Sequence, residues 1–177
     1  MGRHQLQNLS TVITIIDVLR SSGFNISDEA LKNGIASVKW PGRFELLNEK
    51  PLFFLDGGHN KQCAKTVADT LEELCGGKQI LLLIGVLSDK DVKGIIEPVA
   101  SLVKSAVTIT PPSLRAMNGE ALADLLKNEF DIPAVSCECV KDAVERILSM
   151  AQDDDIICAY GSLYSVADIR SCFGKTK

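Results

Sequence analysis

Three residues of types that bind phosphates or nucleotides lie close together in one short stretch of the chain. Arg43, Asp56 and His59 all fall within KWPGRFELLNEKPLFFLDGGHN, residues 39–60. The arginine could clamp a phosphate, because its fork of N–H donors matches an oxyanion. The aspartate could bind ribose hydroxyls or a metal, and the histidine a phosphate or a substrate carboxylate. The plain alternatives are a surface ion pair, a helix cap and a solvent-facing ring at a helix start.

The pattern around Asp56 predicts a strand, a sharp turn and then a helix. LFFL at 52–55 is an apolar run of the length of a buried strand, and RFELLN at 43–48 predicts another strand before it. Gly57 and Gly58 allow a sharp turn, so a helix begins near His59 or Asn60. Ligands in α/β folds bind beyond the carboxyl ends of buried strands, and a helix N-terminus presents N–H groups to an anion.

The rest of the chain alternates apolar runs with helical patterns, which predicts an α/β fold. Further strands are expected at 79–87, 106–110, 133–138 and 155–160, and helices at 59–74, 91–104 with a bend at Pro98, 119–130, 140–151 and 165–173. Nearly continuous apolar strands indicate a Rossmann-like, mostly parallel sheet with helices on both faces. The strand at 43–48, joined to the next by a tight turn, is expected to be the one antiparallel edge strand.

Two helices are expected before this pattern, over residues 5–19 and 28–38, and they resemble an appendage to the α/β part. Ser27 is placed to cap the second helix. Gln5 and Asn8 stand in the first turn of the first helix, where polar residues are ordinary. The composition changes near Lys39–Arg43, which predicts a boundary between residues 1–39 and residues 40–177.

Other polar residues follow the predicted strands and should gather at the same edge of the sheet. They are Ser88–Asp91, Thr110 and Gly161–Ser162. Ser162 could approach a ligand closely, or cap the helix that follows, or do both. Lys90 lies in a charged run that could equally be a solvated loop.

Composition excludes several classes of protein. A net charge of −4 argues against a nucleic-acid partner, which would need a basic face. No apolar run is long enough to cross a membrane. Six cysteines without a CxxC pair, together with two histidines, argue against a zinc site and fit a reducing, cytoplasmic setting with small core cysteines. The GK pair at 77–78 does not belong to a P-loop, because Glu72 and Gln79 stand where Gly and Ser or Thr are required.

Two motifs together resemble one family. WPGRFE at 40–45 and DGGHN at 56–60 are similar to the W-P-G-R-x-E and D-G-A-H-N segments of folylpolyglutamate synthase/dihydrofolate synthase, in the Mur ligase superfamily. DKD at 89–91, the segment ending at Arg115, and GSLYSV at 161–166 also look like landmarks of that family. The resemblance covers the whole chain but only part of the family's length. It implies the C-terminal, glutamate-ligase domain over 40–177, preceded at 1–39 by the two-helix tail of the central ATPase domain.

The resemblance also implies a reaction and its site. In that family, ATP phosphorylates a carboxylate of folate or of its glutamate tail, and L-glutamate then attacks the acyl phosphate. By analogy, Asp56 would hold the ribose, Arg43 would neutralise γ-phosphate charge, and His59 and Ser162 would face the glutamate. Asn8 would contact adenine, with Gln5 as a weaker candidate. The P-loop and most Mg²⁺ ligands are expected in the N-terminal ATPase domain, so this chain alone should be inactive.

Two other interpretations stay open at this point. The chain could belong to a different Mur-type amino-acid ligase, such as one acting on peptidoglycan precursors. It could also be a receiver-like signalling domain, because LFFLD ends in an aspartate and Lys90 and Thr110 follow. The receiver interpretation lacks the acidic pair expected after a first strand.

Overall fold

The computed structural model describes residues 4–175, and the chain divides into two compact units. The first unit is Met1–Pro41 and the second is Gly42–Lys177. The division falls within the stretch where the composition of the sequence changes. Each unit is described separately below.

The first unit consists of two helices, α1 (His4–Ser21) and α2 (Asp28–Ser37). Ser27 caps α2, since its hydroxyl accepts a hydrogen bond from the backbone N–H of Ala30. Arg20 bonds to the carbonyl of Ile26 and pairs with Asp28, which fixes the connection between the helices. Several large apolar side chains of this unit are exposed: Val12, Ile13, Ile15, Val18, Phe24, Val38 and Trp40. Among the described residues, no helix combines the length and apolar character needed to cross a bilayer.

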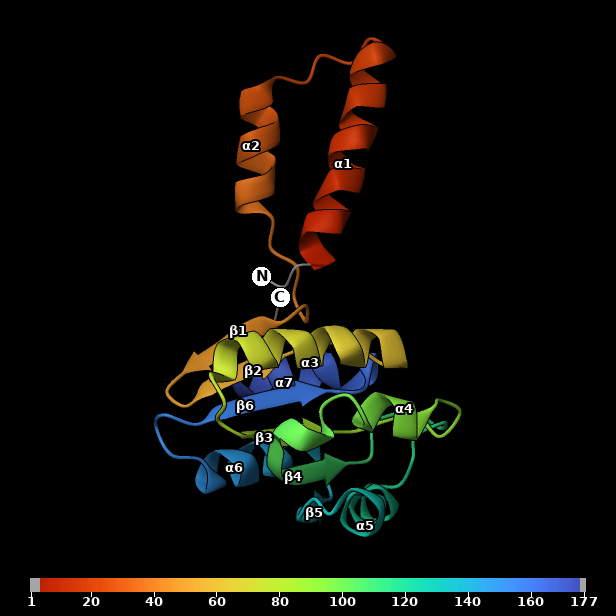
Figure 1. Cartoon of the computed structure of the whole chain (residues 1–177), viewed down its shortest axis with the longest axis vertical. Coiled ribbons are helices and arrows are strands. Elements are labelled where there is room, and N and C mark those ends of the chain that lie inside the picture. The colour runs from red at the N-terminus through yellow and green to blue at the C-terminus, as the bar shows by residue number, and fades with distance from the viewer. Residues whose placement is uncertain (1–3, 176–177) are drawn as a thin grey trace. The chain divides into compact units, whose positions relative to one another are not determined.

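The second unit is built on a six-stranded sheet (Figure 1). Its strands lie in the order β1 (Glu45–Glu49), β2 (Leu52–Leu55), β6 (Ile156–Tyr160), β3 (Ile80–Ile84), β4 (Val103–Ile109) and β5 (Ala134–Cys137). β1 pairs with β2 in the antiparallel sense, and all other neighbours are parallel. The predicted fold, with one antiparallel edge strand, is therefore confirmed.

Helices cover both faces of this sheet, which explains the continuous apolar strands. On one face, α3 (Lys61–Cys75), α4 (Val92–Ile96), the 3₁₀ turn η1 (Ala100–Leu102) and α5 (Gly119–Phe130) surround a large apolar cluster. On the other face lie α6 (Val140–Met150) and α7 (Val166–Cys172), and the 3₁₀ turn η2 (Leu163–Ser165) directly precedes α7. Alternate residues of β3 serve the two clusters: Leu82 packs in the first, and Leu81 and Leu83 in the second.

The helix predicted over 91–104 is wrong in length. α4 ends at Ile96, η1 covers three residues, and β4 already begins at Val103. Pro98 explains the break, because proline has no N–H to donate and its ring clashes with the preceding helical turn. Val103 then pairs with Ile80 in the sheet, so an apolar residue that fitted a helical stripe is part of a strand instead.

The cysteines are less uniformly buried than the sequence suggested. Only Cys75 and Cys158 are buried among the six, and Cys139 caps α6 by accepting a hydrogen bond from the N–H of Asp142. Burial raises the pKa of the Cys158 thiol and of the Tyr160 phenol. The Tyr160 hydroxyl compensates its burial by donating to the carbonyl of Ile95 at 2.6 Å.

Candidate active site at the carboxyl edge of the sheet

Three loop segments of the second unit are hydrogen-bonded to one another at the carboxyl edge of the sheet. The N–H of Gly57, after β2, donates to the carbonyl of Gly42 at 2.7 Å. The N–H of Gly161, after β6, donates to the carbonyl of Gly58 at 2.9 Å. We call residues 42–44, 56–60 and 161–164 the rim. The rim contains Arg43, Asp56 and His59, and the parallel pairing of β2 with β6 brings Ser162 to it.

Asp56 fixes the shape of the rim with both of its carboxylate oxygens. Oδ2 accepts a hydrogen bond from the N–H of Phe44 at 2.9 Å, and Oδ1 accepts one from the N–H of Gly58 at 2.7 Å. The aspartate thus joins the loop before β1 to the loop after β2. Each carboxylate oxygen has a second lone pair, so Asp56 can still accept hydrogen bonds from a ligand.

The turn that carries Arg43 has an uncommon backbone conformation. Phe44 has a φ of 45°, which is costly for a bulky residue and persists only where the surroundings enforce it. Here the bond to Asp56 holds its N–H, and its ring stacks on that of Phe54 at 4.8 Å between centroids. Arg43 is exposed, and within residues 4–175 its guanidinium takes part in no hydrogen bond or ion pair. A fixed turn therefore presents an available cation.

Glu45 stabilises this turn, a role that the sequence analysis missed. Its Oε2 accepts a hydrogen bond from the N–H of Gly42 at 2.8 Å and lies 3.0 Å from Nε of Arg170 on α7. The side chains of Arg170 and Glu45 are only 12% and 19% exposed. Glu45 stands in the WPGRFE motif, which was the one available signal. Arg170 lies 125 residues further along the chain, and no pattern in the sequence indicated that it would contact Glu45.

Two glycines lie where segments at this edge of the sheet approach each other closely. A Cβ atom on Gly57 would lie 2.4 Å from Cδ2 of Leu163 in η2. Gly161 has a φ of 114°, and a Cβ there would lie 2.7 Å from the carbonyl oxygen of Gly85. The close approach of Gly161 to the backbone of Gly85 depends on the absence of a side chain.

His59 lies immediately before the N-terminus of α3. Its Nδ1 is 3.1 Å from the carbonyl oxygen of Gly57, and a carbonyl can only accept, so Nδ1 carries the proton. In the neutral ring, Nε2 is then an acceptor. Asn60 caps the helix, with Oδ1 accepting from the N–H of Cys63 at 2.9 Å. The ring is half-buried, so the solvent-facing alternative describes it only in part.

Ser162 is buried at the rim, with 5% of its surface exposed. Its hydroxyl oxygen accepts a hydrogen bond from the N–H of Tyr164 at 3.2 Å, and it caps η2. The predicted capping role is therefore confirmed, although the capped turn is a 3₁₀ helix that precedes α7. The hydroxyl proton is not used in that bond and can be donated elsewhere.

The remaining predicted residues have separate roles. Asp91 caps α4 through the N–H of Gly94, and Thr110 accepts a hydrogen bond from the N–H of Gly119. Asn8 lies on α1 in the first unit and donates to Oε1 of Gln5 at 3.2 Å. It is therefore described with that unit, apart from the rim.

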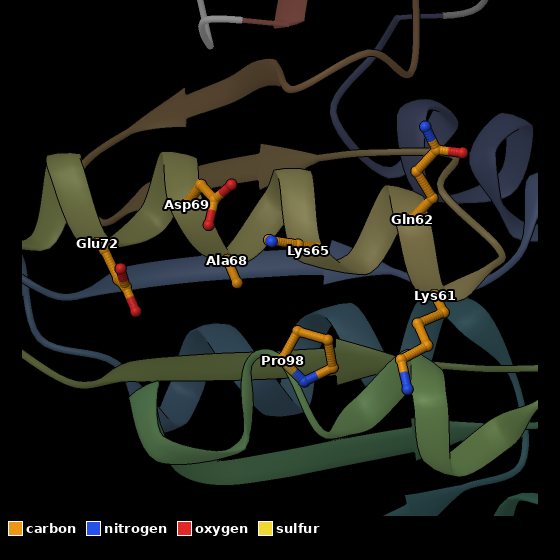
Figure 2. A pocket seen from close by; sticks show the side chains of 7 residues that line it. All are labelled: Lys61, Gln62, Lys65, Ala68, Asp69, Glu72 and Pro98. Carbon is orange, nitrogen blue, oxygen red and sulfur yellow. The ribbon is translucent and has the colours of Figure 1, made fainter.

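A hollow lies elsewhere in the second unit, along α3. This groove, of about 560 Å³, is lined by Lys61, Gln62, Lys65, Ala68, Asp69, Glu72 and Pro98. Figure 2 shows the lining side chains spaced along one helix, with Pro98 facing them from the segment after α4. None of these residues belongs to the rim. Within the described part of the chain, no three His, Cys, Asp or Glu side chains are grouped to hold a metal ion.

The fold and the rim define an α/β domain whose polar, glycine-rich site lies beyond the carboxyl ends of parallel strands. The family described as "Mur ligase, glutamate ligase domain" matches residues 42–163, which lie entirely in the second unit. The chain belongs to this family.

Relatives in sequence and structure identify the branch of the family. The chain is 31% identical to the dihydrofolate synthase/folylpolyglutamate synthase of Bacillus subtilis, over 96% of the chain and 39% of that protein. A Mycobacterium tuberculosis folylpolyglutamate synthase complexed with ADP and AMPPCP has a TM-score of 0.84 and 29% identity, over 98% of this chain and 40% of that one. A bifunctional folylpolyglutamate synthase/dihydrofolate synthase with Mn, AMPPNP and L-glutamate bound has a TM-score of 0.77 and 27% identity, over 90% and 38%. The resemblance inferred from the two motifs is confirmed, and the chain spans about two fifths of these relatives' length.

Proposed function

We propose that this chain is the glutamate-ligase part of an ATP-dependent folylpolyglutamate synthase, which adds L-glutamate to a folate or to its glutamate tail. The observation that carries the proposal is the hydrogen-bonded rim, which joins the segments of Arg43, Asp56, His59 and Ser162. The structures of the relatives support the substrates, since they include nucleotide complexes and one complex with L-glutamate bound.

The reaction proceeds in two balanced steps. ATP transfers its γ-phosphoryl group to a carboxylate of the folate, which gives ADP and an acyl phosphate. The amine of L-glutamate then attacks the carbonyl carbon, a tetrahedral intermediate forms, and its collapse releases phosphate, a proton and the amide. Negative charge develops on oxygen atoms in both steps. Fixed donors and cations in a closed site lower both barriers, because they need no reorganisation.

Arg43 and Asp56 have the chemistry required on the nucleotide side. Arg43 is an exposed cation on a turn whose backbone N–H groups are held by Asp56 and Glu45, so it would meet γ-phosphate charge without reordering. Asp56 has lone pairs left after its two backbone bonds, and these would accept the ribose hydroxyls.

His59 and Ser162 suit the incoming amino acid. With Nδ1 donating to Gly57, Nε2 of His59 would accept a proton from the ammonium group of L-glutamate and leave its amine nucleophilic. The hydroxyl of Ser162 would donate to a carboxylate of the same substrate, because its oxygen already accepts from Tyr164.

The rest of the catalytic unit lies outside this chain. We place the P-loop and the Mg²⁺ ligands in an N-terminal ATPase domain, and we assign residues 1–39 to that domain's tail, with Asn8 toward the adenine. The exposed apolar side chains of Leu114, Leu163 and Tyr164, on loops at or beside the rim, support a partner domain on this side. The enzyme would be cytoplasmic, and this chain alone would not catalyse ligation.

The test compares the 177-residue chain with the complete protein that contains it. Each is incubated with radiolabelled L-glutamate, a reduced folate, Mg²⁺ and ATP, with ATP omitted as a control. We expect the complete protein to incorporate glutamate with one ADP formed per amide, and the isolated chain to incorporate none. Activity only with a peptidoglycan precursor would contradict the folate assignment, and incorporation by the chain alone would contradict the division of the site.

A further inference from the structure

Arg115 connects the loops that follow three neighbouring strands. It lies in the loop after β4, and its Nη1 is 2.8 Å from Oδ2 of Asp89 in the loop after β3. Its Nη2 is 3.4 Å from the hydroxyl oxygen of Tyr164, in the segment after β6. β6, β3 and β4 are consecutive in the sheet (Figure 1), so one guanidinium joins three adjacent strand ends.

The backbone of Arg115 is itself held in place. Its carbonyl accepts hydrogen bonds from the N–H of Ser88 at 2.8 Å and from the hydroxyl of Ser88 at 3.0 Å. The N–H of Met117 donates to the carbonyl of Val86, and Ala116 forms an antiparallel bridge with Leu87. The guanidinium therefore extends from a fixed base, and a contact with it restrains the segment on the other side.

The restrained segment on the β6 side is η2, which forms part of the rim. The N–H of Tyr164 bonds to the hydroxyl of Ser162, and the side chain of Leu163 lies directly against Gly57. A displacement of Tyr164 would therefore move Ser162 and alter the contact with the loop that carries Asp56 and His59.

We propose that Arg115 is a positioning residue of this domain: by bridging Asp89 and Tyr164 it holds η2, and with it Ser162, in register with the rest of the rim. What the rim binds rests on the function proposed above, and the amino-acid substrate is the one whose binding Arg115 would govern. The residue acts through Tyr164 and is not assigned a contact with substrate.

A purely stabilising role does not account for the arrangement. The side chains of Arg115 and Asp89 are 54% and 44% exposed, and an exposed ion pair changes a folding equilibrium only about 1.5- to 5-fold. A displacement of a substrate-binding group by about 1 Å, in contrast, can cost about 100-fold in rate. The bond to Tyr164 and the charge of Asp89 raise the pKa of Arg115, so the bridge remains cationic at any working pH.

The first test measures the bridge itself, in the 177-residue chain, by amide hydrogen exchange. Arg115→Gln should accelerate exchange about 1.5- to 5-fold in residues 162–166, with Arg115→Lys between that variant and the wild type. Tyr164→Phe should have a similar effect, and the double variant should add little to either single one. Arg146→Gln, on the exposed face of α6, is the matched control and should leave these residues unchanged. Unaltered exchange in Arg115→Gln would overturn the proposal.

The second test measures the consequence in the complete protein. Arg115→Gln should lower kcat/KM for L-glutamate about 100-fold, while KM for ATP stays within about twofold, and Arg115→Lys should recover part of the loss. A similar loss of kcat/KM for both substrates would identify a structural role and overturn the proposal. Unchanged kcat/KM for L-glutamate alongside faster amide exchange would also overturn it. If the wild-type protein shows no ligation, the proposed function fails, while the exchange experiment still decides whether the bridge holds η2.

Discussion

The rim and the groove along α3 are both places where a ligand could be sought, and they are built in opposite ways. The groove is an open hollow lined by side chains of one helix, four of them charged, and by Pro98 (Figure 2). The segments of the rim, in contrast, come from three strand ends and are joined by backbone hydrogen bonds and a half-buried carboxylate. Hydrogen bonds thus hold the loops of the rim in one arrangement, as catalysis requires, whereas the groove offers space for a ligand without such bonds.

The ion pairs of the two regions show the same difference. In the groove, Lys61 pairs with Glu97 at 3.6 Å, and their side chains are 65% and 55% exposed. Next to the rim, Nε of Arg170 lies 3.0 Å from Oε2 of Glu45, and both side chains are largely shielded from water. Exposed pairs are screened and contribute little, whereas a shielded pair holds one geometry. Preorganisation thus separates a candidate site from a surface depression.

The largest expected effect is on activity at the rim. Arg43→Met in the complete protein should lower kcat/KM about 10²- to 10³-fold, because a fixed cation facing the transferred phosphoryl group is lost. Its unfolding free energy should change by less than about 0.5 kcal/mol, since the guanidinium has no partner among the described residues. Lys65→Gln, which removes a cation from the groove, should leave activity within about twofold. Equal losses in both variants would remove the distinction between the two regions.

The next effect concerns stability. Asp56→Ala should lower the unfolding free energy of the 177-residue chain by about 2–3 kcal/mol in urea denaturation, because two backbone N–H groups lose a charged acceptor. Asp56→Asn retains one acceptor oxygen and should cost less. Asp69→Ala, in the groove, serves as the matched control, with an expected change below about 0.5 kcal/mol. A similarly small change for Asp56→Ala would show that its bonds do not hold the rim.

A smaller effect is expected for the shielded ion pair. A double-mutant cycle with Glu45→Gln and Arg170→Met should give a coupling energy of about 1–2 kcal/mol in the unfolding free energy. Activity of the complete protein should also fall in Glu45→Gln, because the turn that carries Arg43 loses a support. A coupling near zero would mean that the pair does not hold the turn.

The smallest effect belongs to the groove. The same cycle with Lys61→Gln and Glu97→Gln should give a coupling below about 0.5 kcal/mol that disappears at high salt. A coupling as large as that of Glu45 with Arg170 would require the groove to be as ordered as the rim.

Local patterns were sufficient for much of the fold. The LFFL and QILLLIGVL runs predicted the buried strands β2 and β3, and α5 was placed at 119–130, its observed bounds. The prediction failed at 91–104, where the apolar spacing suited a helix. In the structure, Val103 is instead the first residue of β4. The spacing of apolar residues along the chain cannot decide whether such a residue joins a helix or a strand, because that depends on what packs against it.

The sequence by itself determined the family, the alternation of strands and helices, and the types of the rim residues, because each depends on neighbours along the chain. Only the tertiary structure decided that Asp56 uses both oxygens on the backbone, that Arg170 supports Glu45, and that Arg115 joins three loops. These contacts join residues 12 to 125 positions apart in most cases, and no local rule specifies which donors meet which acceptors once the strands are packed side by side.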